Sequence, residues 1–421
     1  MCQKLVLSAL VLLGFHASLL FGQSSQPAAF VTNNVGDSVA SYIITGDGVL
    51  QFVMAIPSGE GPQTISITPS GRFLAVGHGT ISSTVEELRI FEVFDDATMA
   101  QVLTGFVPDS PLNAKWISNE ILAVTETSLS NDNRLITYRF DEKAFTLTMV
   151  DSVVTGDFNT NITVTREGTR VYANNTFGVA SINAIGVNVD GSLTYLENEV
   201  VEPVFAVAVD ASPDGEFLYG AGGISGTGNE ILAFQIDDAG LISPIAGAQS
   251  PGVSPKVIDM TDDGKILVVG HGTDSTIQSF FRDDESGLVM PTGFSYDVGS
   301  QGNLGDLVVM GDLLLVTDES TSDDGVRGLL SLRIESNGQL KVVSPAVDSG
   351  GARPEYIAAW PGLSAVLLGD INLDGVVDLL DVAPFVAILG SSGFQIEADI
   401  NEDGNVDLLD VQPFVDLLAG G

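Results

Sequence analysis

One pattern recurs along most of this chain: an apolar strand, a turn such as Pro-x-Gly or Asp-Asp-Gly, and a second strand that ends in small or polar residues. Its clearest copies span residues 65–76 and 257–268, and a weaker copy lies at 114–117. Others centre on 162–164, 206–208 and 307–309. A spacing of about 45 to 50 residues suits four short antiparallel strands per unit, which is the size of a propeller blade.

The pattern is incomplete at both ends of the repeat region. Residues 355–359 form a first strand with no second strand after it, whereas residues 30–33 form a second strand with no first strand before it. Pairing these segments in one blade gives seven units and removes the sheet edges that an open ring would expose. The sequence therefore predicts an all-β fold, a seven-bladed β-propeller closed by pairing N- and C-terminal strands in one blade. A β-sandwich with chance periodicity is the alternative, which the even spacing disfavours.

Several strand sequences carry a family resemblance. The segments Phe-Val-Thr-Asn-Asn at 30–34 and Ser-Pro-Asp-Gly at 212–215 resemble the strand signature of lactonase-like (YVTN-type) seven-bladed propellers. That family includes phosphogluconolactonases, muconate-lactonising enzymes and many binding proteins. Its lactonases carry Gly-Pro-Arg-His before a first strand, where residues 61–64 here read Gly-Pro-Gln-Thr. They also carry Asn-Glu-Leu after a second strand, where residues 33–35 read Asn-Asn-Val. We therefore transfer no catalytic residue from the family.

Candidate ligand-binding residues are expected on one face of the ring. In each blade, the loop after the second strand and the loop before the first strand open on the same side. The second-strand ends and the loops before first strands bring to that face Asn34, His78, Glu126, Asn175, His271, Asp318, Gln63, Lys256 and Arg353, next to Asn113, Asn303 and Glu355. Imidazole, carboxylate, amide and cationic groups together suit a polar ligand, a metal or acid–base chemistry. The alternative is that polar residues gather at a wet central mouth without any function.

Two stretches near the C-terminus, 370–381 and 399–410, repeat one pattern of oxygen-bearing side chains. Such side chains stand at loop positions 1, 3, 5, 9 and 12, with glycine at position 6. Calcium takes six to eight oxygen ligands, and alternate positions of a tight loop converge on one point. Position 7 contributes its backbone carbonyl. The predicted ligands of two Ca²⁺ ions are Asp370, Asn372, Asp374, Val376, Asp378 and Asp381 in the first loop, and Asp399, Asn401, Asp403, Asn405, Asp407 and Asp410 in the second.

Each of these loops runs into a near-identical apolar segment, at 379–386 and 408–415. The duplicated loop and helix resembles a type I dockerin, a small α-helical EF-hand-like domain. The resemblance implies docking to a cohesin-type domain, often through Ser or Thr at loop positions 10 and 11, where this chain has leucine pairs. Residues 370–421 hold eleven acidic residues and no Lys or Arg, so we expect charge repulsion to oppose folding until calcium binds.

The first residues are typical of a secretory signal peptide. One positive charge at Lys4 precedes an apolar run over residues 5–21 and a polar stretch from Gln23. A retained membrane anchor is the alternative, which is disfavoured because the run is short and no basic stop follows it. No other run could span a bilayer, so we expect no stable membrane span. The single cysteine, Cys2, lies within this segment, so disulfides are excluded from the mature chain.

The net charge of −39, from 16 basic and 55 acidic residues, disfavours binding to nucleic acid or to anionic membranes. We expect three parts: a signal peptide at 1–22, a propeller at 23–363 and a dockerin at 364–421. These parts predict a secreted or cell-surface calcium-binding protein whose propeller binds a carbohydrate or small polar molecule and which docks to a cohesin-type partner. The alternative is a lactonase or carbohydrate-active hydrolase in polysaccharide catabolism, and the sequence leaves open whether the propeller is catalytic.

Overall fold

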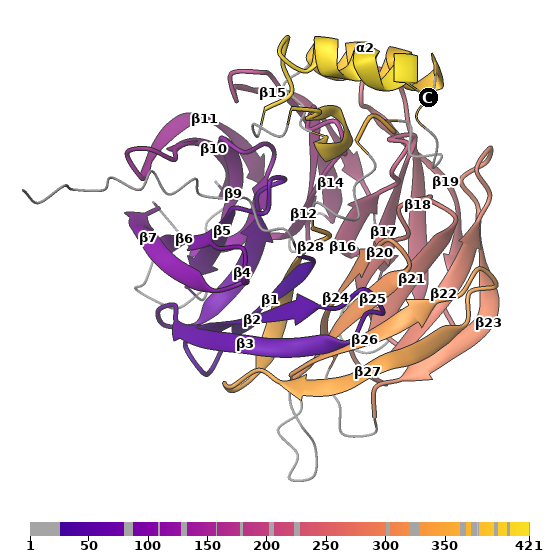
Figure 1. Cartoon of the computed structure of the whole chain (residues 1–421). Helices are drawn as coiled ribbons and strands as arrows, with labels where there is room; N and C mark the ends of the chain where they lie inside the picture. The colour runs from indigo at the N-terminus through magenta and orange to yellow at the C-terminus, as the bar shows by residue number, and fades with distance from the viewer. Residues whose placement is uncertain are drawn as a thin grey trace, which may run out of the picture.

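The repeat folds into seven blades around a central axis (Figure 1). The structure is a computed structural model, and it describes residues 26–79, 87–107, 110–127, 133–156, 158–176, 180–201, 206–222, 228–299, 304–319, 328–362, 368–371, 377, 379–390, 395–401 and 405–420. Within these residues there are seven four-stranded antiparallel sheets followed by short helices. The predicted seven-bladed propeller is confirmed.

Six blades are continuous in sequence, and in each of them the first strand lies innermost. Their strands are β4 (Pro62–Ile67), β5 (Phe73–His78), β6 (Glu87–Val93) and β7 (Met99–Phe106); β8 (Ser110–Trp116), β9 (Ile121–Thr127), β10 (Asn133–Asp141) and β11 (Thr146–Gly156); β12 (Asn159–Val164), β13 (Arg170–Asn175), β14 (Ser181–Val187) and β15 (Leu193–Val200); β16 (Ala206–Ala211), β17 (Phe217–Gly222), β18 (Glu230–Ile236) and β19 (Ile242–Gln249); β20 (Pro255–Met260), β21 (Ile266–His271), β22 (Thr276–Arg282) and β23 (Val289–Asp297); β24 (Leu304–Met310), β25 (Leu313–Asp318), β26 (Gly328–Ile334) and β27 (Leu340–Asp348).

The remaining blade combines strands from both ends of the repeat region. Its order is β28 (Pro354–Trp360), β1 (Ala28–Asn33), β2 (Ser38–Ile44) and β3 (Leu50–Pro57). The innermost pair is antiparallel, with Ala29 opposite Ala359 and Val31 opposite Ile357. In Figure 1 the yellow-brown β28 accordingly lies beside the indigo β1. This pairing leaves no blade short of its inner strand.

Burial along the strands follows their place in a blade. Every residue of β1, β5, β17 and β21 is buried, because both faces of a second strand meet neighbouring blades. The fourth strands lie at the rim, and in β23 exposed and half-buried residues alternate from Pro291 to Asp297. The apolar core is therefore a set of layers between blades, each filled by side chains of two neighbouring sheets.

Buried tyrosines tie neighbouring blades together. The hydroxyl of Tyr172 on β13 donates to the carbonyl of Gly240 at 3.1 Å, and that of Tyr219 on β17 donates to Gly287 at 2.7 Å. Each acceptor lies in the turn between the third and fourth strands of the next blade. Both rings are fully buried, so the hydroxyls need these partners, and the partners fix the stagger of one blade on the next.

The C-terminal segment forms a small helical module. It contains the 3₁₀ turns η2 (Leu379–Asp381) and η3 (Ile396–Ala398) and the helices α1 (Val382–Leu389) and α2 (Val411–Gly420). Phe385 and Phe414 meet at its centre with ring centroids 4.3 Å apart. The prolines of the repeated segment are the third residues of α1 and α2, in the first turn, where a missing N–H breaks no helical hydrogen bond.

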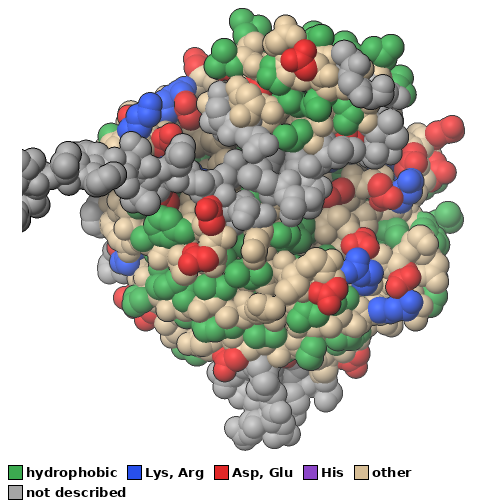
Figure 2. All heavy atoms as spheres, viewed as in Figure 1, with side chains coloured by type: hydrophobic (Ala, Val, Ile, Leu, Met, Phe, Trp, Pro, Cys, Tyr) green, Lys and Arg blue, Asp and Glu red, His purple; other side chains and the backbone are tan. Residues whose placement is uncertain are grey.

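The surface of this module is apolar and acidic. In Figure 2 hydrophobic side chains gather over the α2 region, and Asp and Glu outnumber Lys and Arg on the visible face. The two leucine pairs predicted at loop positions 10 and 11 are solvent-exposed, with Leu379 79% and Leu408 81% exposed. None of the helices in the described part of the chain has the length and apolar character needed to cross a membrane.

Candidate functional site

Two cations and two carboxylates meet at one mouth of the propeller. Lys256 Nζ lies 3.2 Å from Glu319 Oε1, and Arg353 Nε lies 3.0 Å from Glu319 Oε2. The Arg353 guanidinium also approaches Glu355 Oε1 at 3.5 Å through Nη2. We call Lys256, Glu319, Arg353 and Glu355 the mouth cluster. Glu319 is its centre, because it bridges both cations.

Three blades supply the mouth cluster. Lys256 is the second residue of β20, Glu319 follows β25, and Glu355 is the second residue of β28. Arg353 precedes β28 with a φ of 58°, a left-handed conformation that a side chain of this size seldom adopts. Its carbonyl accepts the N–H of Asn34 at 2.9 Å, which holds the strained turn in place. Such strain is often found where a fold positions a functional side chain.

The carboxylates form a buried floor and the cations cover it. Glu319 and Glu355 are 6% and 8% exposed, whereas the side chains of Lys256 and Arg353 are 39% and 45% exposed. Burial, with the charge of Glu319 as the next cause, raises the pKa of Glu355 to about 7. Glu355 Oε2 accepts no hydrogen bond within the described residues. At neutral pH this carboxyl group can therefore gain or release a proton.

The two predicted histidines lie elsewhere. His271 Nδ1 donates to the Thr276 carbonyl at 2.9 Å, so its Nε2 accepts from Ser250 Oγ at 2.6 Å. His78 is also fully buried, and among the described residues neither ring nitrogen has a hydrogen-bond partner. Burial lowers the pKa of His78 to about 4 and also lowers the pKa of His271, so both imidazoles are neutral. Neither ring donates to or accepts from the mouth cluster.

The predicted amides serve mainly as ties between strands. Asn34 Nδ2 donates to the Pro62 carbonyl of the next blade at 3.1 Å. Asn175 Nδ2 donates to the Thr155 carbonyl at 2.6 Å and is nearly fully buried. Gln63 is half-buried on β4, Glu126 is buried on β9, and Asp318 ends β25. The position of Asn303 lies outside the described residues.

The structure adds three carboxyl groups that the sequence did not predict. Glu319 stands one residue after the predicted Asp318, and only the side-chain direction distinguishes the two. Further inside, Asp259 Oδ2 on β20 accepts the N–H of Val309 at 2.7 Å, and Asp306 Oδ2 on β24 accepts the N–H of Ile357 at 3.0 Å. Burial raises the pKa of both carboxyl groups. Acidic residues inside otherwise apolar first strands were the available signal.

The two predicted calcium loops contain buried carboxylates. Asp381 Oδ1 accepts the N–H of Ile371 at 2.7 Å in the first loop. In the second loop Asp410 accepts the N–H groups of Asn401 and Asp407, at 3.0 and 2.8 Å. The end-of-loop carboxylates Asp370, Asp381, Asp399 and Asp410 are all buried.

An oxygen-only donor set of this kind fits calcium. The predicted ligands Asn372, Asp374, Val376, Asp378 and Asp403 lie outside the described residues. The described residues alone gather no group of three or more acidic or imidazole side chains that could hold a metal ion. The fit to calcium therefore rests on the four buried carboxylates and on the absence of Lys and Arg from residues 370–421.

Comparison with protein families matches both parts. Residues 368–413 match the dockerin type I domain, and residues 195–304 match the family described as lactonase, 7-bladed beta-propeller. The chain carries a type I dockerin domain C-terminal to a lactonase-like propeller. The resemblance found in the strand and loop sequences is thereby confirmed. The dockerin domain implies a cohesin-type partner, type I dockerin domains bind calcium, and dockerin proteins are typically extracellular or attached to the cell surface.

Solved structures share the fold of the lactonase-like propeller. A candidate 6-phosphogluconolactonase from Bacteroides fragilis is 14% identical, with a TM-score of 0.65 over 80% of this chain and 98% of that chain. The periplasmic gluconolactonase of Pseudomonas aeruginosa is 14% identical, with a TM-score of 0.64 over 80% and 100%. A protein of unknown function from Desulfotomaculum acetoxidans is 16% identical, with a TM-score of 0.62 over 80% and 99%. None of the curated proteins compared with the chain matches it.

Proposed function

We propose that the chain is an exported docking protein whose propeller binds a carbohydrate or a small polar molecule at the mouth cluster. The observation that carries this proposal is the stacking of two outward cations on two buried carboxylates at the propeller mouth. Guanidinium and ammonium groups donate hydrogen bonds, and the carboxylates accept them. A ligand rich in hydroxyl groups can use both kinds of partner, because a hydroxyl group both donates and accepts, which a purely apolar ligand cannot.

Export and attachment complete the proposal. A signal peptide at 1–22 would direct the chain out of the cell, a propeller over 23–363 would bind the ligand, and a dockerin over 364–421 would hold it to a cohesin-type partner. Leu379 and Leu408 with their leucine neighbours are solvent-exposed and offer an apolar docking surface. The surface of the cohesin-type partner that meets these leucines would then be apolar as well, whereas a dockerin with Ser or Thr at loop positions 10 and 11 needs a partner that hydrogen-bonds to hydroxyl groups.

Two calcium ions would belong to the dockerin domain. Asp370, Asp381, Asp399 and Asp410 would hold them, together with the loop positions between these residues. Calcium supplies positive charge where the chain has only carboxylates, so its binding contributes directly to folding. The domain's own residues position the loops, because the position-12 carboxylates Asp381 and Asp410 already accept loop N–H groups.

A lactonase is the second candidate function, and the pKa of Glu355 favours it. At neutral pH the carboxylate of Glu355 could accept a proton from water while the water oxygen attacks a lactone carbonyl. Arg353 or Lys256 could donate to the carbonyl oxygen as it becomes negative. The ring C–O bond would then break, and the leaving alkoxide would take the proton that Glu355 accepted from the water, which returns Glu355 to its carboxylate form. The missing Gly-Pro-Arg-His motif leaves this the second choice.

One pair of assays separates the two functions. We expect the calcium-loaded chain to bind selected carbohydrates on a glycan array, and Arg353→Ala and Lys256→Ala to weaken this binding at least about tenfold. The control is Arg134→Ala, which removes an exposed arginine of β10, a strand that supplies no residue of the mouth cluster. Hydrolysis of aldonolactones that Glu355→Gln abolishes would instead establish the lactonase. Binding untouched by both mouth variants would refute the proposed site.

A further inference from the structure

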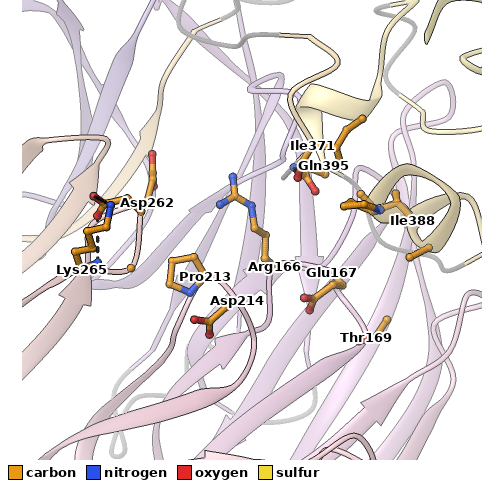
Figure 3. A pocket seen from close by; sticks show the side chains of 14 residues that line it. Arg166, Glu167, Thr169, Pro213, Asp214, Asp262, Lys265, Ile371, Ile388 and Gln395 are labelled. Atoms are coloured by element: carbon orange, nitrogen blue, oxygen red, sulfur yellow. Dashed lines mark hydrogen bonds and ion pairs between the residues drawn. The ribbon is translucent and has the colours of Figure 1, made fainter. Parts of the chain in front are cut away.

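A cavity lies at the end of the first strands opposite the mouth cluster, between the propeller and the dockerin domain (Figure 3). Its volume is about 660 Å³, within the range of small-molecule sites. The propeller wall comes from the turns that follow β12, β16 and β20, in three consecutive blades. The dockerin wall comes from α1 and from residues around the first calcium loop.

Arg166 is the principal donor of the propeller wall. Its side chain extends between the propeller turns and the dockerin residues Ile371 and Gln395 (Figure 3). The guanidinium lies 3.8 Å from Glu397 Oε1, which is too long for a hydrogen bond, and it makes no hydrogen bond within the described residues. A guanidinium has five N–H donors, so most of the donor capacity of Arg166 is available to a ligand.

The dockerin wall is apolar. Pro384, Ala387 and Ile388 of α1 face the cavity, and Ile371 continues this surface. Gln395 Nε2 donates to the Ile371 carbonyl at 2.7 Å and holds the two segments together. A ligand in the cavity thus meets polar groups on one side and hydrocarbon on the other.

The balance of charge selects the class of ligand. Asp214 pairs with Arg282, and Asp263 pairs with Lys265 at 3.4 Å, so these carboxylates are already matched. Glu167 and Asp262 form no ion pair in the described part of the chain; Asp262 Oδ2 accepts the Gly311 N–H at 3.0 Å, which leaves the Glu167 carboxylate and Asp262 Oδ1 as acceptors. An anion would meet this excess of carboxylates, and a cation would meet Arg166. A neutral molecule with many hydroxyl groups and one C–H face satisfies both walls.

We propose that this cavity binds a neutral carbohydrate, and that calcium in the dockerin domain is linked to this binding. The dockerin wall depends on the first calcium loop, because the Ile371 N–H donates to Asp381 Oδ1 at 2.7 Å. The Gly369 N–H donates to the Glu397 carbonyl at 2.7 Å, which joins the start of that loop to the residue that faces Arg166. Calcium held between Asp370 and Asp381 would therefore fix one wall of the cavity, and by reciprocity the sugar would strengthen calcium binding.

Ligand-observed NMR titrations of the full calcium-loaded chain test the proposal. Glucose, glucosamine and glucuronate share one ring and differ in charge, so they serve as neutral, cationic and anionic probes. We expect glucose to bind more tightly than either charged sugar. We expect Arg166→Ala and Ala387→Trp each to weaken glucose binding at least about tenfold, the first by removing donors and the second by filling the cavity. Ala387 is exposed on α1, so its replacement leaves the module core intact.

Controls separate this cavity from the mouth cluster. Arg134→Ala is expected to bind glucose as the unaltered chain does. Chelation of calcium with EGTA is expected to abolish binding at the cavity. It is expected to leave binding at the mouth cluster, which Arg353→Ala removes, unchanged. Calcium affinity is measured by competition with a chelating dye. Glucose is expected to raise the affinity for calcium by the same factor by which calcium raises the affinity for glucose. Preference for glucosamine or glucuronate, binding that survives both cavity variants, or equal affinity with and without calcium would overturn the proposal.

Discussion

Glu355 gives the mouth cluster a pH dependence whose sign and size follow from the structure. Burial, together with the charge of Glu319, raises its pKa from 4.5 to about 7. Between these pH values the folded chain holds a proton that the unfolded chain has released, so the stability contributed by this group falls as pH rises. At about 1.4 kcal/mol per pKa unit, the full change costs the folded state about 3 kcal/mol above pH 7.

Replacing Glu355 by glutamine removes this cost and keeps the shape of the side chain. We expect Glu355→Gln and the unaltered chain to have similar unfolding free energies at pH 4. The unfolding free energy of the variant, relative to that of the unaltered chain, should rise between pH 4.5 and 7. At pH 8 the variant should be more stable by about 3 kcal/mol. Both tryptophans, Trp116 and Trp360, lie in propeller strands, so urea unfolding followed by their fluorescence reports on the propeller.

A matched control isolates the effect of burial. Glu120→Gln removes an exposed carboxylate that pairs with Arg139, and it should change stability by no more than about 1 kcal/mol. Calcium is kept saturating in all samples, so changes in the dockerin domain cancel in the difference. A stability difference for Glu355→Gln that stays constant from pH 4 to 8, or that shrinks as pH rises, would refute the reasoning.

Two further predictions concern the dockerin domain. Removal of calcium with EGTA should speed hydrogen exchange at the amides of α1 and α2, because eleven carboxylates and no Lys or Arg crowd residues 370–421; unchanged exchange in the full chain would show that the domain folds without metal. Leu408→Asp alters a side chain that is 81% exposed, so thermal stability should change by less than about 0.5 kcal/mol while binding to a cohesin-type partner weakens at least about tenfold. Surface plasmon resonance measures this affinity, and an unaltered value would place the docking surface elsewhere.

The architecture could be predicted because local sequence patterns repeat along the chain. The strand–turn–strand pattern recurs at an even spacing. The unmatched strand at each end of the repeat region can complete a blade by pairing with the unmatched strand at the other end. The calcium loops are equally local, since their ligands stand at fixed positions of one short segment. Neither inference needs the direction of a side chain relative to a distant blade.

The candidate site depends on that direction, which sequence alone does not supply. His78 and His271 end their strands as predicted, but a second strand buries both faces, so both imidazoles point into packed layers. Asp318 and Glu319 are neighbours on the chain, and it is Glu319, which the sequence did not single out, that pairs with the cations of two other blades. Lys256 and Arg353 lie close together because β20 and β28 are both innermost strands of the ring. Their separation in sequence gives no indication of this.

The blade shared by both chain ends sets a condition on when the propeller can fold. Ala29 must find Ala359, so the contact that closes the ring joins the earliest and latest strands to be synthesised. Contacts of such long sequence separation form slowly, because much of the chain must be ordered before they are gained. The innermost strand of that blade also ends shortly before the dockerin domain begins. A chain cut after residue 362 can therefore still close its ring, whereas a cut before residue 354 leaves β1 without its inner neighbour.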